Sequence, residues 1–218
     1  MVVLWDWNGT LLDDVAYCVA VNNRVLPRFG YAQTDVLRYR SLFRFPVRDY
    51  YRDLGITDAD FDAVARCWTE EYLAGFPRIP LHGDALSTVI RLHNSGICQR
   101  VISATRHDLL TEQLTRFPDL TSRLDGWSGI QDIYADSKVD MAVRYFREND
   151  LDPAEAVFIG DTGHDAETAA AIGCRCLLVS RGHQKETVLR RSGVPVMGSL
   201  AQAADWVLAQ KTGTETPR

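Results

Sequence analysis

The strongest constraint on the fold of this chain is an alternation of short apolar runs with segments of helical periodicity after residue 80. Short apolar runs bounded by turn residues are typical of buried strands, and apolar residues at helical spacing are typical of amphipathic helices. We expect strands at about 98–103, 126–130, 156–159 and 174–179, and helices at about 84–93, from 108, and at 139–148, 163–172 and 200–209. Together with a first strand in Val2–Trp7, these units predict an α/β fold, a Rossmann-like doubly wound parallel sheet with helices on both faces.

A block of purely helical pattern interrupts this alternation between the first strand and the rest. Apolar residues recur at helical spacing in Val15–Phe29, Val36–Phe43, Val47–Leu54 and Ala59–Phe76, and Pro77 and Pro80 close the block. No strand-like alternation separates these segments. We therefore predict a catalytic core formed by residues 1–13 and 81–218, with an inserted α-helical cap at 14–80.

Composition excludes several classes of function. The 218 residues carry a net charge of −5, so no cationic field favours binding to nucleic acid. No apolar run approaches the roughly 18 residues that span a membrane, and the first residues lack the pattern of a signal peptide. The five cysteines are odd in number and scattered, which favours free thiols in a reducing compartment. We expect a cytoplasmic monomer or homodimer that binds neither nucleic acid nor membrane.

Polar residues follow several of the predicted strands, where ligands bind in open parallel sheets. Carboxylates gathered at such an edge suit a hard cation such as Mg²⁺, whereas hydroxyl, ammonium and backbone N–H groups suit phosphate oxygens. The groups in question are Asp6-Trp7-Asn8-Gly9-Thr10 after the first strand, Ser103-Ala104 after the second, Gly160-Asp161 to Asp165 after the fourth, and Lys138 at the start of the preceding helix.

In their order and placement, these motifs resemble those of haloacid dehalogenase superfamily phosphohydrolases that carry an α-helical cap. Phosphoglycolate phosphatases and β-phosphoglucomutases are the most similar in layout. The resemblance implies a Mg²⁺-dependent phosphatase that acts on a small phosphorylated metabolite. It also implies a two-step reaction through an aspartyl-phosphate intermediate.

The resemblance assigns a role to each matching residue. Asp6 matches the nucleophile, and Lys138 matches the lysine that neutralises charge on nucleophile and phosphate. Thr10, Ser103 and the backbone around Ala104 match the phosphate-binding groups. The implied Mg²⁺ ligands are Asp6, the backbone carbonyl of Asn8, Asp161 and Asp165.

Asn8 departs from the pattern, because phosphatases of this superfamily usually carry Asp two residues after the nucleophile. That Asp is a general acid and base, a function worth about 10²- to 10⁴-fold in rate that an amide cannot perform. Three interpretations follow. The enzyme is slow or acts on a substrate with a good leaving group, or another group, such as His183 or a cap residue, supplies the proton. The third interpretation is that Asn8 is an engineered substitution that traps the phosphoenzyme. The unusual neighbour Trp7 favours a natural variant. A phosphotransferase or mutase, and a catalytically weak member that binds a phosphorylated ligand or a partner protein, are the alternatives.

Basic residues give the remaining sequence signals. Arg44 and Arg48, in the cap, are four residues apart and would share a helix face if the helix extended that far, where they could hold a carboxylate or second phosphate of the substrate. The alternative is that both are solvated surface residues and that the aromatic residues around them form the core of the cap. Only three of the 24 basic residues are lysines, and none precedes Lys138, which excludes the phosphonate-cleaving branch with its cap lysine. His164 is expected to face solvent in a loop.

Overall fold

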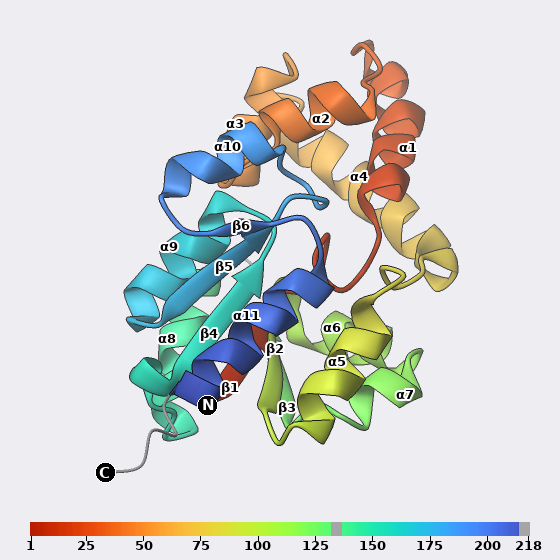
Figure 1. Cartoon of the computed structure of the whole chain (residues 1–218). Helices are drawn as coiled ribbons and strands as arrows, with labels where there is room; N and C mark the ends of the chain where they lie inside the picture. Colours follow the sequence, from red (N-terminus) through yellow and green to blue (C-terminus); the bar gives the residue numbers. More distant parts are fainter. Residues whose placement is uncertain (132–136, 214–218) are drawn as a thin grey trace.

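The computed structural model describes residues 1–131 and 137–213. A helical layer lies above a layer built on one central sheet (Figure 1). The sheet has six strands in the order β3-β2-β1-β4-β5-β6, and every pair is parallel. The predicted α/β fold with a doubly wound parallel sheet is therefore confirmed. The strands are β1 (Val2–Trp5), β2 (Cys98–Arg106), β3 (Gly126–Ile130), β4 (Ala156–Gly160), β5 (Arg175–Val179) and β6 (Val196–Met197).

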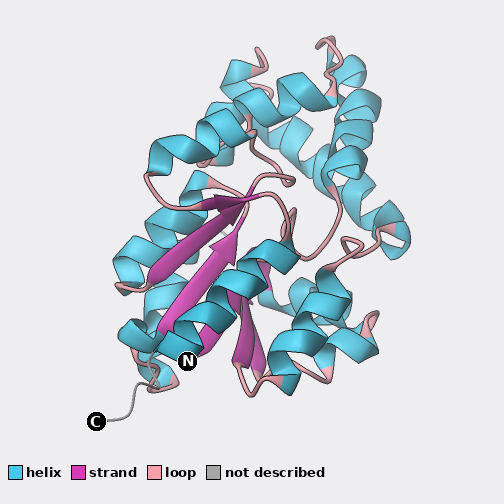
Figure 2. Cartoon of the chain, in the orientation of Figure 1, coloured by secondary structure: helices cyan, strands magenta, loops and turns pink. Residues whose placement is uncertain are grey.

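Helices cover both faces of the sheet (Figure 2). On one face lie α5 (Ala85–Asn94), α6 (His107–Thr115), α7 (Pro118–Thr121) and α11 (Leu200–Gly213), and on the other lie α8 (Lys138–Glu148) and α9 (Gly163–Ile172). Strand residues alternate between the two cores, as the pleat requires. Val3 and Trp5 pack on the first face, and Val2 and Leu4 pack on the second.

Four helices form the upper layer: α1 (Val15–Val25), α2 (Val36–Leu42), α3 (Val47–Asp53) and α4 (Phe61–Gly75). Short 3₁₀ turns occupy Leu26–Phe29, Phe76–Arg78, Pro153–Glu155 and Arg190–Ser192, and α10 (Glu186–Leu189) follows β5. The helices of the upper layer pack through buried aromatic rings. The Tyr39 ring, on α2, stacks on the Phe43 ring and meets the Tyr50 ring edge-on. We call residues 14–80 the cap.

Two adjacent connections join the cap to the sheet layer. Leu12 forms an antiparallel bridge with Leu81, the Asp13 N–H donates to the Pro80 carbonyl at 2.9 Å, and the His82 N–H donates to the Leu11 carbonyl at 2.9 Å. The chain thus leaves the sheet layer and returns to it at one place. These contacts support the predicted boundaries at 13/14 and 80/81, which stay a prediction.

The structure differs from the sequence prediction in its shortest elements. β2 continues to Arg106, past the predicted end at Ser103, with a register shift against β3 between these two residues. The two-residue strand β6 pairs with β5 and was not predicted, although the short apolar run Val194–Met197 lies between two glycines. Among the described residues, no helix is both long and apolar enough to cross a membrane. The five cysteines, all within that part of the chain, are free thiols.

Candidate active site

The carboxyl edge of β1 and β4 brings two of the predicted carboxylates together. Trp5 pairs in register with Ile159, and the Asp6 N–H donates to the Ile159 carbonyl at 2.8 Å. Asp161 is the residue directly after β4, so its side chain lies at the same edge of the sheet as Asp6. Thr10 joins them, since its hydroxyl lies 3.2 Å from Oδ2 of Asp6 and 3.0 Å from Oδ1 of Asp161. All three side chains are buried.

Gly9 allows this close approach. Its φ is +75°, and a Cβ there would lie 2.4 Å from Oδ2 of Asp161 and 2.5 Å from the His183 ring. Gly182 is equally constrained, because its Cβ would lie 2.0 Å from the same carboxylate oxygen. Backbone therefore surrounds the Asp161 carboxylate, and the His183 N–H donates to it at 2.5 Å.

Lys138, the first residue of α8, inserts its ammonium group between two carboxylates. Its Nζ atom donates to Oδ1 of Asp6 and, at 2.5 Å, to Oδ1 of Asp165. Asp165 lies in the first turn of α9, where it accepts the N–H of Thr162 at 2.9 Å and its hydroxyl at 2.7 Å. Hydrogen bonds at a helix N-terminus thus fix Asp165, and Asp165 in turn fixes the lysine.

Negative charge in this cluster exceeds what Lys138 compensates. Burial raises the pKa of Asp6 to about 8; Lys138 opposes the rise, and two carboxylate neighbours add to it. Burial likewise raises the pKa of Asp161 to about 6, with Asp165 adding to it and a nearby histidine opposing it. The pKa of Asp165 is lowered instead, because Lys138 and local hydrogen bonds outweigh its burial.

The same carboxylates fit a hard divalent cation. Asp6, Asp161 and Asp165 each offer an oxygen within 4.8 Å of the others, and all three residues are buried. An oxygen-only donor set with surplus negative charge is the chemistry that Mg²⁺ prefers. Two of the three residues are also the ones whose pKa is raised, chiefly by burial and in part by the neighbouring carboxylates.

The predicted phosphate-binding residues of β2 lie at the edge of this cluster. Ser103 is buried, and its hydroxyl accepts the Thr105 N–H at 3.0 Å. Ala104 is half-buried and lies in the register shift of β2. Thr105, which the sequence prediction did not include, donates its hydroxyl to Oδ1 of Asn8 at 2.8 Å. Their role in phosphate binding stays a prediction.

Asn8 contacts a residue that the prediction also missed. Its Nδ2 atom lies 2.9 Å from Oδ2 of Asp14 and 3.0 Å from the hydroxyl of Tyr72, on α4. The Tyr72 hydroxyl donates to the same Asp14 oxygen at 2.8 Å. Asp14 is fully buried just before α1. A signal existed in the sequence, because Asp13 and Asp14 form a carboxylate pair a few residues after the amide.

His183, named above as a possible proton source, is buried between the cap and the sheet layer. Its Nε2 atom lies 3.2 Å from Oδ1 of Asp14, and its Nδ1 atom lies 2.8 Å from the Tyr39 hydroxyl. Burial disfavours the charged ring, but the charge and hydrogen bond of Asp14 outweigh it and raise the pKa of His183 to about 9. The pKa of Asp14 is lowered, because His183 outweighs the effect of burial.

The loop between α2 and α3 packs against the loop after β5. Gln184 Nε2 donates to the Phe43 carbonyl at 2.8 Å, and the Phe43 ring lies 4.9 Å from the His183 ring. Phe45 stacks on His164 at 4.8 Å between ring centroids. The expectation of a solvent-facing loop histidine is therefore wrong: His164 lies in the first turn of α9 and is partly covered by the cap.

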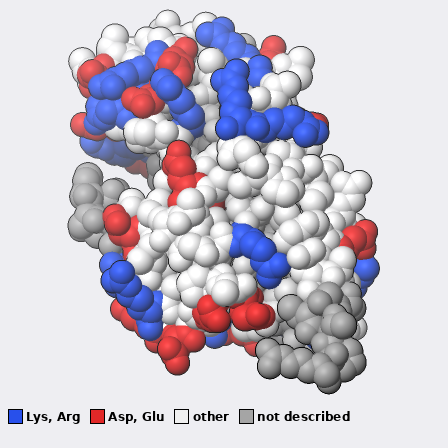
Figure 3. Space-filling view, turned by 60° about the vertical axis from the view of Figure 1, so that its left-hand side comes forward, with Lys and Arg blue, Asp and Glu red and all other residues white. Residues whose placement is uncertain are grey.

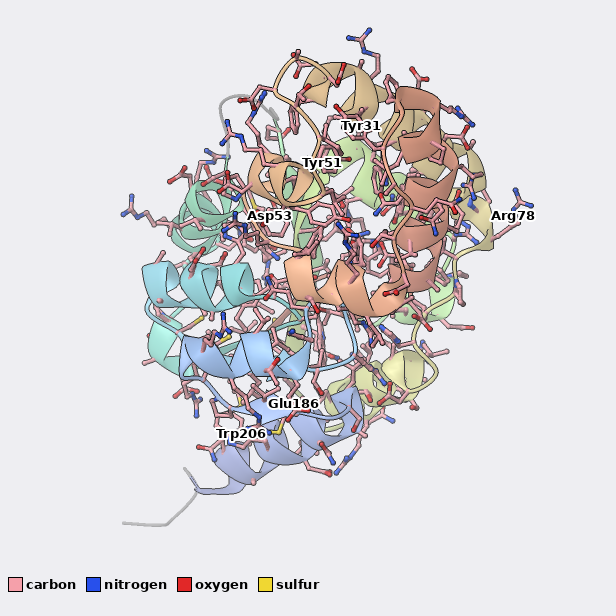
Figure 4. All side chains as sticks on the ribbon, turned by 90° about the horizontal axis from the view of Figure 1, so that it is seen from above. Tyr31, Tyr51, Asp53, Arg78, Glu186 and Trp206 are labelled. Atoms are coloured by element: carbon pink, nitrogen blue, oxygen red, sulfur yellow. The ribbon has the colours of Figure 1, made fainter. Side chains whose placement is uncertain are left out.

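Arg44 and Arg48 do not share a helix, because α3 begins at Val47. Arg44 pairs with Asp53 at 2.9 Å, and the Arg48 guanidinium lies over the Phe61 ring and 3.4 Å from an aspartate of the cap. Basic side chains gather over the upper part of one face, interspersed with acidic ones (Figure 3). Figure 4 looks down on the cap, where Asp53 and Tyr51 come from the same short helix. Substrate binding by either arginine stays a prediction.

Three comparisons place this chain among known proteins. A family model described as haloacid dehalogenase-like hydrolase matches residues 3–179. A phosphoglycolate phosphatase of Synechococcus elongatus is 22% identical over 208 residues, which cover 94% of this chain and 91% of the relative. Phosphoglycolate phosphatase 1 of Pseudomonas aeruginosa is 22% identical over 192 residues, which cover 84% of this chain and 70% of the relative.

A solved structure has the same fold. It is a haloacid dehalogenase-like family hydrolase from Streptococcus pneumoniae, with a TM-score of 0.83 at 16% identity. The match covers 94% of this chain and 97% of that one. It therefore includes the sheet layer and the cap together.

Proposed function

Since the chain belongs to the haloacid dehalogenase-like hydrolases, we propose that it is a phosphatase that cleaves the phosphate ester of a small metabolite, with Asp6 as nucleophile. The observation that carries the proposal is the arrangement around Asp6. This buried carboxylate accepts hydrogen bonds on both oxygens, from Lys138 on Oδ1 and from Thr10 on Oδ2, beside a cluster that suits a divalent cation.

The first step forms a bond between an Asp6 oxygen and phosphorus, while the bond from phosphorus to the ester oxygen breaks. The products are an aspartyl phosphate and an alkoxide, which takes a proton from solvent water and leaves as the alcohol. In the second step water attacks phosphorus and gives up its proton to solvent, the Asp6 carboxylate leaves, and inorganic phosphate is released. Lys138 and Thr10 orient the carboxylate in both steps, because they fix its two oxygens separately.

Asp6, Asp161, Asp165 and the backbone carbonyl of Asn8 would hold Mg²⁺. When bound there, it would supply positive charge where one anion attacks another. Lys138 contributes a second positive charge from the side of α8, and its contact with Asp165 prevents it from moving away. The net charge of −5 makes such local compensation necessary for a phosphorylated substrate.

Asn8 decides which esters react well. Its amide cannot protonate the leaving oxygen, so the rate depends strongly on how well the alcohol leaves. Small phosphorylated acids of the phosphoglycolate type are the substrates named for relatives, and aryl or acyl phosphates should react faster than alkyl esters. A phosphotransferase or mutase would release little phosphate and instead transfer it to an added acceptor.

The test is phosphate release with Mg²⁺ over esters of graded leaving-group pKa, with Asp6→Asn as the control. We expect release by the wild type, loss of release in the variant, and a steep fall in kcat as leaving-group pKa rises. A flat dependence would show that another residue already donates the proton. No release from any ester, with or without an added acceptor alcohol, would contradict the enzymatic proposal and leave a phospho-ligand-binding role.

A further inference from the structure

Asp14 is a buried carboxylate beside the proposed reaction centre, and both of its oxygens have hydrogen-bond partners. Its Oδ1 atom accepts the Gly9 N–H at 2.9 Å and lies 3.2 Å from Nε2 of His183. Its Oδ2 atom accepts from the Asn8 amide at 2.9 Å and from the Tyr72 hydroxyl at 2.8 Å. The Cys18 thiol is a further partner of Oδ2, at 3.7 Å. Only 1% of the residue is exposed, so these partners replace water around the charge.

The contacts of Asn8 require an amide at that position. Its Nδ2 atom faces two acceptor atoms, one on Asp14 and one on Tyr72, and its Oδ1 atom accepts from Thr105. A carboxylate at residue 8 would lie about as close to the Asp14 oxygen as the amide nitrogen does, with no water to screen the repulsion. A protonated acid would offer one hydrogen where the amide offers two.

Asp14 also connects three parts of the molecule that meet at the reaction centre. Gly9 belongs to the turn after the nucleophile, His183 to the loop after β5, and Tyr72 to the cap helix α4. These segments are far apart in the sequence, yet each bonds directly to this one carboxylate. A change at residue 14 therefore alters the turn that carries Asn8 as well as the contact with the cap.

We propose that Asp14 is a positioning residue for the reaction, and that Asn8 and Asp14 form one amide–carboxylate pair whose two members can be exchanged together but not changed singly. The proposal rests on the proposed function. It means that the missing carboxylate at residue 8 has a counterpart at residue 14. Restoring Asp at residue 8 alone would then impair the enzyme.

The experiment compares Asn8→Asp, Asp14→Asn and the double variant with the wild type, using p-nitrophenyl phosphate with Mg²⁺ and thermal unfolding. We expect each single variant to lose about 5 °C or more in Tm and about 10-fold or more in kcat. The double variant should return to within about 3-fold of the wild-type kcat, with KM little changed. All rates are measured below the lowest Tm.

Asp13 provides the matched control. It is the adjacent aspartate, is exposed, and lies 3.6 Å from His82 instead of Asn8. Asp13→Asn should neither lower kcat nor rescue Asn8→Asp.

Additive effects of the two changes on Tm and kcat would overturn the proposal. So would recovery of Tm in the double variant without recovery of kcat, because Asp14 would then be structural only. If the wild type releases no phosphate from any ester, the proposed function fails and the role in positioning fails with it. The Tm measurements would still report whether the two residues act as a pair.

Discussion

The hydroxyl of Tyr39 lies 2.8 Å from Nδ1 of His183. This contact joins a cap helix to the loop after β5, and both residues are buried. The histidine bonds to Asp14 through its other ring nitrogen. The position of the cap over the sheet layer and the polar network beside Asp6 are therefore coupled through one imidazole ring.

Tyr39→Phe removes this hydrogen bond and keeps the packing of the ring. We expect the free energy of unfolding to fall by about 1–2 kcal/mol, because a buried ring nitrogen loses its partner. Urea unfolding measures the change. Tyr51→Phe is the control, since the hydroxyl of this buried cap tyrosine makes no hydrogen bond to the part of the chain that the structure describes. Equal losses in the two variants would show that the contact with His183 contributes nothing.

Lys138→Met leaves the carboxylates of Asp6 and Asp165 without their buried counter-charge. We expect a loss of about 3–5 kcal/mol in unfolding free energy without divalent cations, the usual cost of an uncompensated buried charge. The double variant with Asp6→Asn should recover part of that loss, because it has one carboxylate fewer. A Lys138→Met protein as stable as the wild type would contradict this account.

Asp161→Asn weakens the proposed cation site, since it removes a charge from the three-carboxylate cluster. The Mg²⁺ concentration for half-maximal phosphate release should rise at least about 10-fold, and chelation should abolish release by the wild type. Asp152→Asn, at an exposed aspartate before β4, should leave the Mg²⁺ requirement unchanged. An unaltered requirement in Asp161→Asn would exclude this residue as a ligand.

Asp84 makes the stability of the fold depend on pH. Burial opposes its charge, but contact with Arg181 and hydrogen bonds outweigh burial and lower its pKa. A lowered pKa stabilises the folded state at pH values above the unfolded-state pKa, which is near 3.8. This stabilisation is lost as the pH falls through the folded-state pKa. Asp84→Asn should cost below about 1 kcal/mol at pH 7 and lose less stability between pH 7 and pH 3 than the wild type. Urea midpoints at both pH values test this.

The sequence predicted the elements whose signal is local. Runs such as Ala156–Gly160 are apolar and bounded by turns, so their strands follow from burial alone. The residues after them lie together because parallel strands end at one edge, which explains why Asp6, Asp161 and Asp165 could be expected to meet. Lys138 could be placed because it begins a helix directed at that edge.

Contacts between distant segments were not predictable in the same way. Nothing in the sequence around Tyr72 indicates that its hydroxyl contacts both Asn8 and Asp14, because these contacts join α4 to residues 64 and 58 positions earlier in the chain. The ring stacking that covers His164 likewise comes from a cap loop more than 100 residues earlier. Periodicity specifies which face of a helix is buried, but it does not specify which polar atoms meet across an interface.

Lys138 is almost fully buried, whereas Lys185 is exposed. Since lysines are so scarce in this chain, an amine-reactive reagent meets few competing side chains, and modification of Lys138 requires that the cluster around Asp6 become accessible. Mass-spectrometric labelling of Lys138, normalised to Lys185, would therefore measure how often the cluster around Asp6 becomes accessible to reagent. It would also measure how far a bound phosphate ester reduces that accessibility.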